Sequence, residues 1–228
     1  MSSPHLVAYV AVRDRLDAAL QDSDESVEVP ACPGWRVRDV VAHLTGVCED
    51  WVGHRTDGYA SDGWTAAQVA RSSALSVQQM LERWRDLTPS FAALGDDPVM
   101  GQPAVWAFGD AVCHEADIYG AVGSGHVPHE ALVLGLSAYV KRWRERLAQR
   151  HAPTLLLRAP DARDWWLGVP DDPDAVTAEA SAHGLFRALT GRRSESQVRS
   201  WLWSSDPGPF VQAGLPYPFR WARQDLVD

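Results

Sequence analysis

Two carboxylates and an imidazole recur at helical spacing in the segment 106–122. Asp110, His114 and Asp117 follow one another at intervals of four and three residues, which on a helix places their side chains in one narrow stripe. The neighbouring residues are mostly apolar or small, so this helix is expected to be buried. A carboxylate and an imidazole buried together need a proton, a hydrogen-bonded partner or a metal ion to offset the cost of leaving water. The stripe is therefore a candidate metal site.

A third ligand would have to come from another helix of the same core. His43 lies at the edge of the apolar face of a helix predicted over residues 37–54. Together, His43, Asp110 and His114 would supply three protein ligands and leave one coordination position open, as catalytic metals require. The same spacing also fits a buried His–Asp hydrogen bond without a metal. Both interpretations remain open at this point.

Other polar residues near the stripe offer alternatives. Asp50 and His54 form a rival pair four residues apart, close to a helix end where solvent exposure is expected. Asp117 could orient a ligand imidazole from behind, or simply bond to the backbone. Cys113 could be a soft ligand, although such a cysteine is more often a small core residue. His183 fits a turn or a helix cap.

Composition and charge narrow the classes of function. The 228 residues carry a formal net charge of −9, which argues against a nucleic-acid-binding protein. Three cysteines without tight spacing indicate a reducing compartment and neither a disulfide framework nor a structural zinc knuckle. The sequence shows no signal peptide and no apolar run of bilayer length. We therefore expect a cytoplasmic protein with no membrane or nucleic-acid partner.

The elements that must position these residues follow from the apolar periodicity. Helical spacing predicts five helices, over residues 4–21, 37–54, 65–94, 106–122 and 128–150. Short apolar runs between turn residues then predict strands, at residues 154–159, 165–169 and 175–180, before a short helix over 183–193. The expected fold is α+β, with a helical bundle over residues 1–152 and a small α+β domain over residues 153–228.

Two segments resemble a known family. VPACPGWRVRDVVAHL, at residues 29–44, and D-x-x-x-H-E-x-D, at residues 110–117, resemble the mycothiol-dependent maleylpyruvate isomerase family of actinobacteria. The later segment LFRALTGRRS, at residues 185–194, is similar to the small C-terminal domain of that family. The resemblance implies a DinB-like, up-down four-helix metal-binding bundle followed by a sterol-carrier-like α+β domain.

The resemblance also implies a ligand set. The family places a His on the second helix and a Glu-x-x-x-His pair on a later one around a divalent metal ion, usually zinc. Carried over, these positions are His43, Asp110 and His114. Asp110 departs from the usual Glu, so its shorter carboxylate must lie nearer the ion. Arg36 stands where the family often has a Ser or Thr that caps the helix.

An activity follows from the resemblance as well. It implies an enzyme that uses mycothiol as cofactor or co-substrate, either a cis–trans isomerase acting on maleylpyruvate or a thiol S-transferase. Metal binding would lower the pKa of the small thiol and make it a nucleophile. A basic residue of the C-terminal domain would hold the anionic electrophile, with Arg192, Arg220 and Arg223 as candidates. We expect a monomer or a homodimer.

A non-catalytic function remains as the alternative. The same bundle could bind a metal ion or another ligand in stress response or regulation. The open coordination position and the presence of a second domain favour the enzyme. Turnover of an electrophile that requires both a metal ion and a small thiol would distinguish the two.

Overall fold

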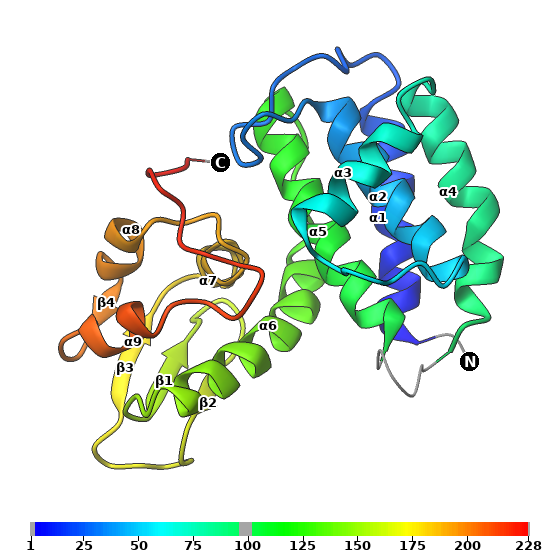
Figure 1. The fold of residues 1–228 in the computed structure, drawn as a ribbon. Coiled ribbons are helices and arrows are strands. Elements are labelled where there is room, and N and C mark those ends of the chain that lie inside the picture. The colour runs from blue at the N-terminus through cyan, green and yellow to red at the C-terminus, as the bar shows by residue number, and fades with distance from the viewer. Residues whose placement is uncertain (1–2, 96–101, 228) are drawn as a thin grey trace. The chain divides into compact units, whose positions relative to one another are not determined.

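The computed structural model describes residues 3–95 and 102–227, which form two compact units (Figure 1). The first unit extends to Val127 and the second runs from Pro128 to Val227. Helices make up the first unit, and a small sheet with helices makes up the second. The α+β fold class expected from the sequence is confirmed.

The first unit contains a four-helix bundle. Its helices are α1 (Pro4–Ala19), α2 (Val37–Val52), α3 (Asp62–Arg71), α4 (Val77–Ala92) and α5 (Pro103–Val122). Helix α1 packs on α4 and α5, and α2 packs on the same two helices, which closes a ring of four. Helix α3 packs on α2 from outside this ring (Figure 1). The bundle core therefore lies between α1, α2, α4 and α5.

Large apolar side chains hold the bundle together. The ring of Tyr9 on α1 lies 5.1 Å from that of Trp84 and 5.0 Å from that of Phe91, both on α4. All three are buried, and burying one large apolar side chain contributes about 1.5–3 kcal/mol to folding. Arg15 on α1 also forms two hydrogen bonds with the buried Glu115 of α5, at 2.6 and 2.7 Å. These contacts fix α5, the helix that carries the polar stripe.

The sequence prediction of one long helix over residues 65–94 is wrong. Helix α3 ends at Arg71 and α4 begins at Val77. The side chain of Ser76 accepts a hydrogen bond from the backbone N–H of Gln79, and the Gln79 side chain accepts one from the N–H of Ser76. This reciprocal cap begins a new helix, whereas the apolar periodicity alone runs across the break.

Helix α2 begins with an unusual N-cap residue, Arg36, and Asp39 in the first turn compensates for it. Arg36 at the N-cap offers no side-chain acceptor, but the Asp39 carboxylate accepts a hydrogen bond from the Arg36 backbone N–H at 2.9 Å. An acidic residue in the first turn also interacts favourably with the helix dipole. The start of α2 is therefore stabilised without the Ser or Thr that the family often has.

The second unit is a four-stranded sheet with helices. Its elements are α6 (His129–Gln149), β1 (Leu155–Arg158), β2 (Trp165–Leu167), β3 (Val176–Glu179), α7 (Ala182–Leu189), α8 (Glu195–Arg199), β4 (Leu202–Trp203) and α9 (Gly208–Ala213). The strand order is β2-β1-β3-β4, with β1 and β3 parallel and both edge strands antiparallel. Helix α6 packs on α7, β2 and α9. The short elements α8, β4 and α9 lay in a segment for which the sequence predicted no structure.

Contacts of α6 bear on where the chain divides. The indole N–H of Trp143 donates to the carbonyl of Gly214, and Arg146 donates to the carbonyl of Ala213. These bonds and the packing on α7 place α6 in the second unit. The boundary expected near residue 152 came from the change from helices to strands, and it stays a prediction about which part folds alone.

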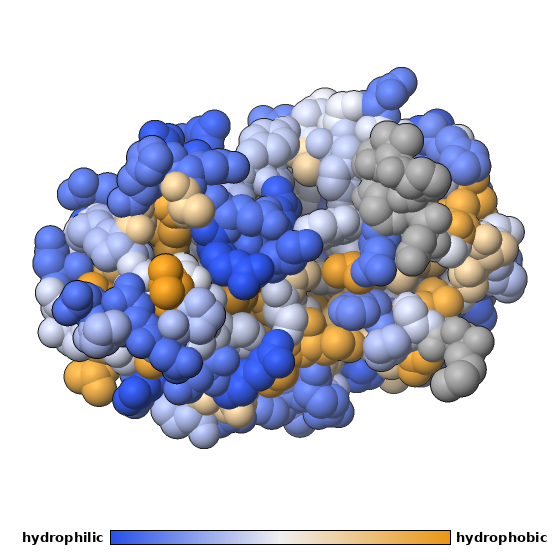
Figure 2. Space-filling model, turned by 90° about the horizontal axis from the view of Figure 1, so that it is seen from below, coloured by the Kyte–Doolittle hydropathy of each residue, from blue (hydrophilic) through white to orange (hydrophobic). Residues whose placement is uncertain are grey.

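No helix among the described residues is long and apolar enough to cross a lipid bilayer. On the face shown in Figure 2, hydrophilic residues predominate and hydrophobic residues form small, scattered groups.

Candidate metal centre

The structure brings His43, Asp110 and His114 together. His43 Nε2 lies 3.2 Å from one carboxylate oxygen of Asp110, and His114 Nε2 lies 3.6 Å from the other. One possible ligand atom from each of the three residues lies within 4.8 Å of the other two. Nitrogen and oxygen ligands of a tetrahedral zinc ion would be about 3.4 Å apart. The three side chains therefore fit a zinc-sized ion.

Gln68 on α3 fixes the orientation of His43. The Asp50 carboxylate can only accept hydrogen bonds, so Gln68 must turn its amide NH₂ toward it, at 2.8 Å. The amide oxygen of Gln68 then lies 2.7 Å from His43 Nδ1. That nitrogen must carry the ring proton, which leaves the Nε2 lone pair directed toward Asp110. His43 is thus held in the tautomer that a metal ligand requires.

A glycine on α2 makes this contact possible. A Cβ atom at Gly46 would lie 2.5 Å from Cβ and 3.2 Å from Cα of Gln68. Gly46 therefore allows the backbone of α3 to approach α2 closely enough for Gln68 to reach His43. Gln68 was missed in the sequence, where its only signal is Gly46, a glycine in the middle of an amphipathic helix.

In the rival pair Asp50 and His54, both carboxylate oxygens of Asp50 are engaged by other side chains. Asp50 was expected near solvent but is 1% exposed. One of its oxygens accepts hydrogen bonds from Arg55 and Arg71, at 2.9 and 2.6 Å, and the other from Gln68. His54 is exposed and lies beyond the end of α2. Asp50 instead ends the hydrogen-bond chain that orients His43.

Asp117 and Cys32 lie on the other side of His114. A carboxylate oxygen of Asp117 is 3.0 Å from His114 Nδ1, the position in which it would orient that ring from behind. The thiol of Cys32 lies 3.3 Å from the same oxygen and 3.6 Å from His114 Nδ1. Cys32 was missed, although it belongs to the CPGW segment of residues 32–35.

The loop that carries Cys32 also supplies an aromatic wall. The backbone N–H of Val29 donates to the carbonyl of Trp35, that of Cys32 to Val29, and that of Trp35 to Cys32, each at 2.9 Å. The loop is therefore a tight turn. The ring of Trp35 lies 5.4 Å from that of His43 and stacks at 6.3 Å on that of His114. Trp35 therefore packs against both imidazoles and limits their contact with water.

The remaining candidates of the sequence analysis take structural positions. Cys113 is buried in α5. His183 is in the first turn of α7, and Ser181 caps that helix through a hydrogen bond to the backbone N–H of Gly184. Cys48 is buried in the core, and burial raises the pKa of its thiol to about 12, which disfavours the nucleophilic thiolate.

The candidate arginines of the second unit differ in exposure. Arg192 and its neighbour Arg193 are partly buried and donate to the backbone carbonyls of Thr190 and Arg192. Arg220 and Arg223 are exposed. Arg220 lines a pocket of about 340 Å³ that also contains Arg146 and three aromatic residues, Tyr217, Phe219 and Trp221.

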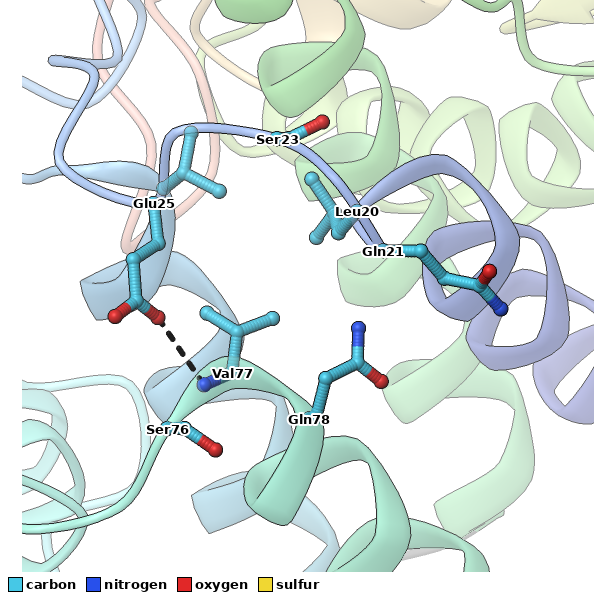
Figure 3. Close-up of a pocket in the computed structure, with 8 residues that line it drawn as sticks. Leu20, Gln21, Ser23, Glu25, Ser76, Val77 and Gln78 are labelled. Atoms are coloured by element: carbon cyan, nitrogen blue, oxygen red, sulfur yellow. Dashed lines mark hydrogen bonds between the residues drawn. The ribbon is translucent and has the colours of Figure 1, made fainter.

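The first unit has a separate pocket at the start of α4. It measures about 250 Å³, and its eight lining residues include none of the candidate ligands (Figure 3). Glu25 closes one side by accepting a hydrogen bond from the backbone N–H of Val77, at 3.1 Å. This contact satisfies one of the free backbone N–H groups at the start of α4.

Known proteins resemble the chain in sequence and in fold. The mycothiol maleylpyruvate isomerase N-terminal domain family matches residues 8–119. Two solved structures resemble the fold: a mycothiol-dependent maleylpyruvate isomerase, with 16% identity and a TM-score of 0.54, and a histidine-to-alanine mutant of such an enzyme, with 15% and 0.55.

Each of these alignments covers 95% of this chain and 95% of the solved chain. No curated protein matches the sequence. At such low identity the solved structures establish the fold alone, whereas the family match spans all three candidate ligands. Residues 8–119 therefore belong to the mycothiol maleylpyruvate isomerase N-terminal domain family.

Proposed function

We propose that His43, Asp110 and His114 hold one divalent metal ion, most suitably zinc, at which a small thiol is activated. The convergence of three ligand atoms with zinc-like spacing supports this proposal. Each histidine has a separate partner that holds its ring, Gln68 for His43 and Asp117 for His114. A plain hydrogen-bonded cluster would not need both imidazoles to turn Nε2 toward one carboxylate.

The bound ion would lower the pKa of a thiol that occupies its open coordination position. The residues around the ligands would then have two tasks. Gln68 and Asp117 keep both ligand lone pairs directed at the ion, and Trp35 shields the histidine rings from water. Shielding from water strengthens the electrostatic interactions on which thiolate formation depends.

The proposed reaction is thiol-dependent chemistry on a small anionic electrophile, with mycothiol as the thiol. In a maleylpyruvate-like isomerisation, the thiolate sulfur adds to one carbon of the cis double bond, and the π electrons move into the conjugated carbonyl. Rotation about the resulting single bond and expulsion of the thiolate give the trans product, so no atom is gained or lost. S-transfer would stop after addition and protonation.

The electrophile would need a cationic partner for its carboxylates. Of the candidates Arg192, Arg220 and Arg223, Arg220 lines a described pocket next to a second arginine, Arg146. We therefore assign substrate binding to Arg220 first. We further propose that the protein is cytoplasmic and works as a monomer or a homodimer.

Activity assays on metal-loaded protein test the function. We expect turnover of maleylpyruvate, or of another electrophile in a panel, that requires both zinc and mycothiol and is lost in H43A and H114A. Elemental analysis should find one zinc ion per wild-type chain and none in the double variant. Metal binding without any thiol-dependent turnover would contradict the catalytic proposal and favour a metal- or ligand-binding function. Full metal retention in the double variant would refute the site itself.

A further inference from the structure

Three potential ligands meet on the side of His114 that faces away from Asp110. Cys32 Sγ, His114 Nδ1 and a carboxylate oxygen of Asp117 are separated by 3.6, 3.3 and 3.0 Å. They come from the tight loop before α2 and from two successive turns of α5. His114 is the only one of the three that also belongs to the proposed zinc site.

The separations match those around a metal ion. Sulfur, nitrogen and oxygen ligands of a tetrahedral zinc ion lie about 3.6 Å apart for the two pairs with sulfur and about 3.4 Å apart for nitrogen and oxygen. Each observed separation is within about 0.4 Å of these values. A small movement of the side chains would therefore be enough to bind an ion.

The arrangement does not fit a Cys–His–Asp catalytic triad. In such a triad the nucleophile contacts one imidazole nitrogen and the carboxylate contacts the other. Here, Cys32 and Asp117 both contact Nδ1 of His114. The Nδ1 atom cannot accept a proton from the thiol while it donates its own proton to the carboxylate.

We propose that Cys32, His114 Nδ1 and Asp117 form a second cation position, which takes thiophilic ions such as Zn²⁺, Cd²⁺ or Cu⁺. A thiolate is a soft ligand and selects such ions over Mg²⁺, Ca²⁺ or Mn²⁺. The first position has two imidazoles and a carboxylate and contains no sulfur. The two positions thus differ in their preference for soft ions.

The shared histidine couples the two positions. A neutral imidazole has a lone pair on only one of its two nitrogens. An ion at the first position needs the lone pair on Nε2, whereas an ion at the second needs it on Nδ1. Both are filled together only if His114 gives up both ring protons. A thiophilic ion at the second position therefore opposes metal binding at the first.

Titration of metal-free protein with Cd²⁺ tests the proposal through the ultraviolet absorption of the thiolate–Cd²⁺ bond. We expect this absorption in the wild type and in H43A, which keeps the second position while the first is broken. It should be lost in Cys32→Ser and in H114A, and it should require more Cd²⁺ in Asp117→Asn. Cys48→Ala, which removes a buried thiol, should keep it.

Circular dichroism of each metal-free variant separates loss of the site from loss of the fold. Absence of the absorption in folded wild-type protein would overturn the proposal and leave the three residues as a hydrogen-bonded cluster. Equal absorption in folded Cys32→Ser would overturn it as well. Because the signal is expected in H43A, failure of the proposed zinc site or of its activity would leave this result unaffected.

Discussion

Replacing Gly46 by alanine tests whether the metal centre depends on the close approach of α3 to α2. A Cβ atom at this position would lie 2.5, 2.6 and 3.2 Å from Cβ, Cγ and Cα of Gln68. Carbon atoms in contact are normally about 3.5–4.0 Å apart. Because one of the three is a backbone atom, rotation of the Gln68 side chain cannot relieve the overlap. Helix α3 must move away by about 1 Å.

Two opposing effects determine the stability of the Gly46→Ala variant. Alanine in a helix interior is more favourable than glycine by roughly 0.5–1 kcal/mol, whereas overpacking costs about 1–3 kcal/mol. The free energy of unfolding should therefore fall by about 0–2.5 kcal/mol. This change is small enough for the variant to fold.

Metal affinity should respond more strongly. The contact of 2.7 Å between His43 Nδ1 and the Gln68 oxygen would lengthen beyond hydrogen-bond distance if α3 moved by about 1 Å. Loss of a residue that orients a ligand histidine typically costs about 10–100-fold in metal affinity. Competition with a chromophoric chelator measures this loss for Zn²⁺, and urea denaturation of the metal-free protein measures stability.

The matched control is Gly63→Ala on α3. A Cβ atom at Gly63 would meet no atom within 4 Å, so both affinity and fold should be kept. Wild-type affinity in Gly46→Ala would refute the link between helix spacing and the orientation of His43. Weak binding in Gly46→Ala together with normal binding in Gln68→Ala would show that the distortion acts on α2 itself and that Gln68 has no role.

Three further predictions concern other parts of the chain. The Asp117→Asn variant should still bind zinc, but with an affinity lower by about 10–100-fold. Unchanged zinc affinity in chelator competition would mean that Asp117 does not support His114. Arg220→Ala should lower kcat/KM on an anionic electrophile by about ten- to a hundredfold, as expected when one charge-assisted contact is lost, whereas Arg223→Ala should not; equal effects would reject Arg220 as the substrate-binding arginine. Because burial raises the pKa of the Cys48 thiol to about 12, almost none of this thiol is ionised at pH 8. Mass spectrometry after iodoacetamide treatment at pH 8 should find Cys32 alkylated and Cys48 intact, and the reverse pattern would contradict the burial of Cys48.

Local spacing explains why part of the site could be predicted. Asp110 and His114 share a helix, so their proximity follows from helix geometry alone. The position of His43 depends on how α2 packs against α5. Its place at the edge of an apolar helix face made it the candidate third ligand, and the family resemblance implied the same residue. The change from helical patterns to strand patterns near residue 152 likewise predicted the α+β class before any packing was known.

The missed residues depend on tertiary contacts. Gln68 reaches His43 only because α3 packs on α2 at Gly46, and nothing in the sequence around Gln68 shows this. Cys32 lies 82 residues from His114 in the chain, so only the folded loop shows that they meet.

The break between α3 and α4 was missed for a different reason. The cap at Ser76 is a local signal, and the apolar periodicity that runs across it concealed it.

The two histidines of the candidate metal centre are supported in different ways. Asp117 contacts His114 directly at 3.0 Å, so its negative charge acts on the imidazole and makes it a stronger electron donor to a metal ion. The charge of Asp50 reaches His43 only through the neutral amide of Gln68, and Arg55 and Arg71 both bind the same carboxylate. Gln68 therefore orients His43 without adding charge to it. If a metal ion binds at the candidate centre, we therefore expect His114 to be the stronger electron donor of the two histidines.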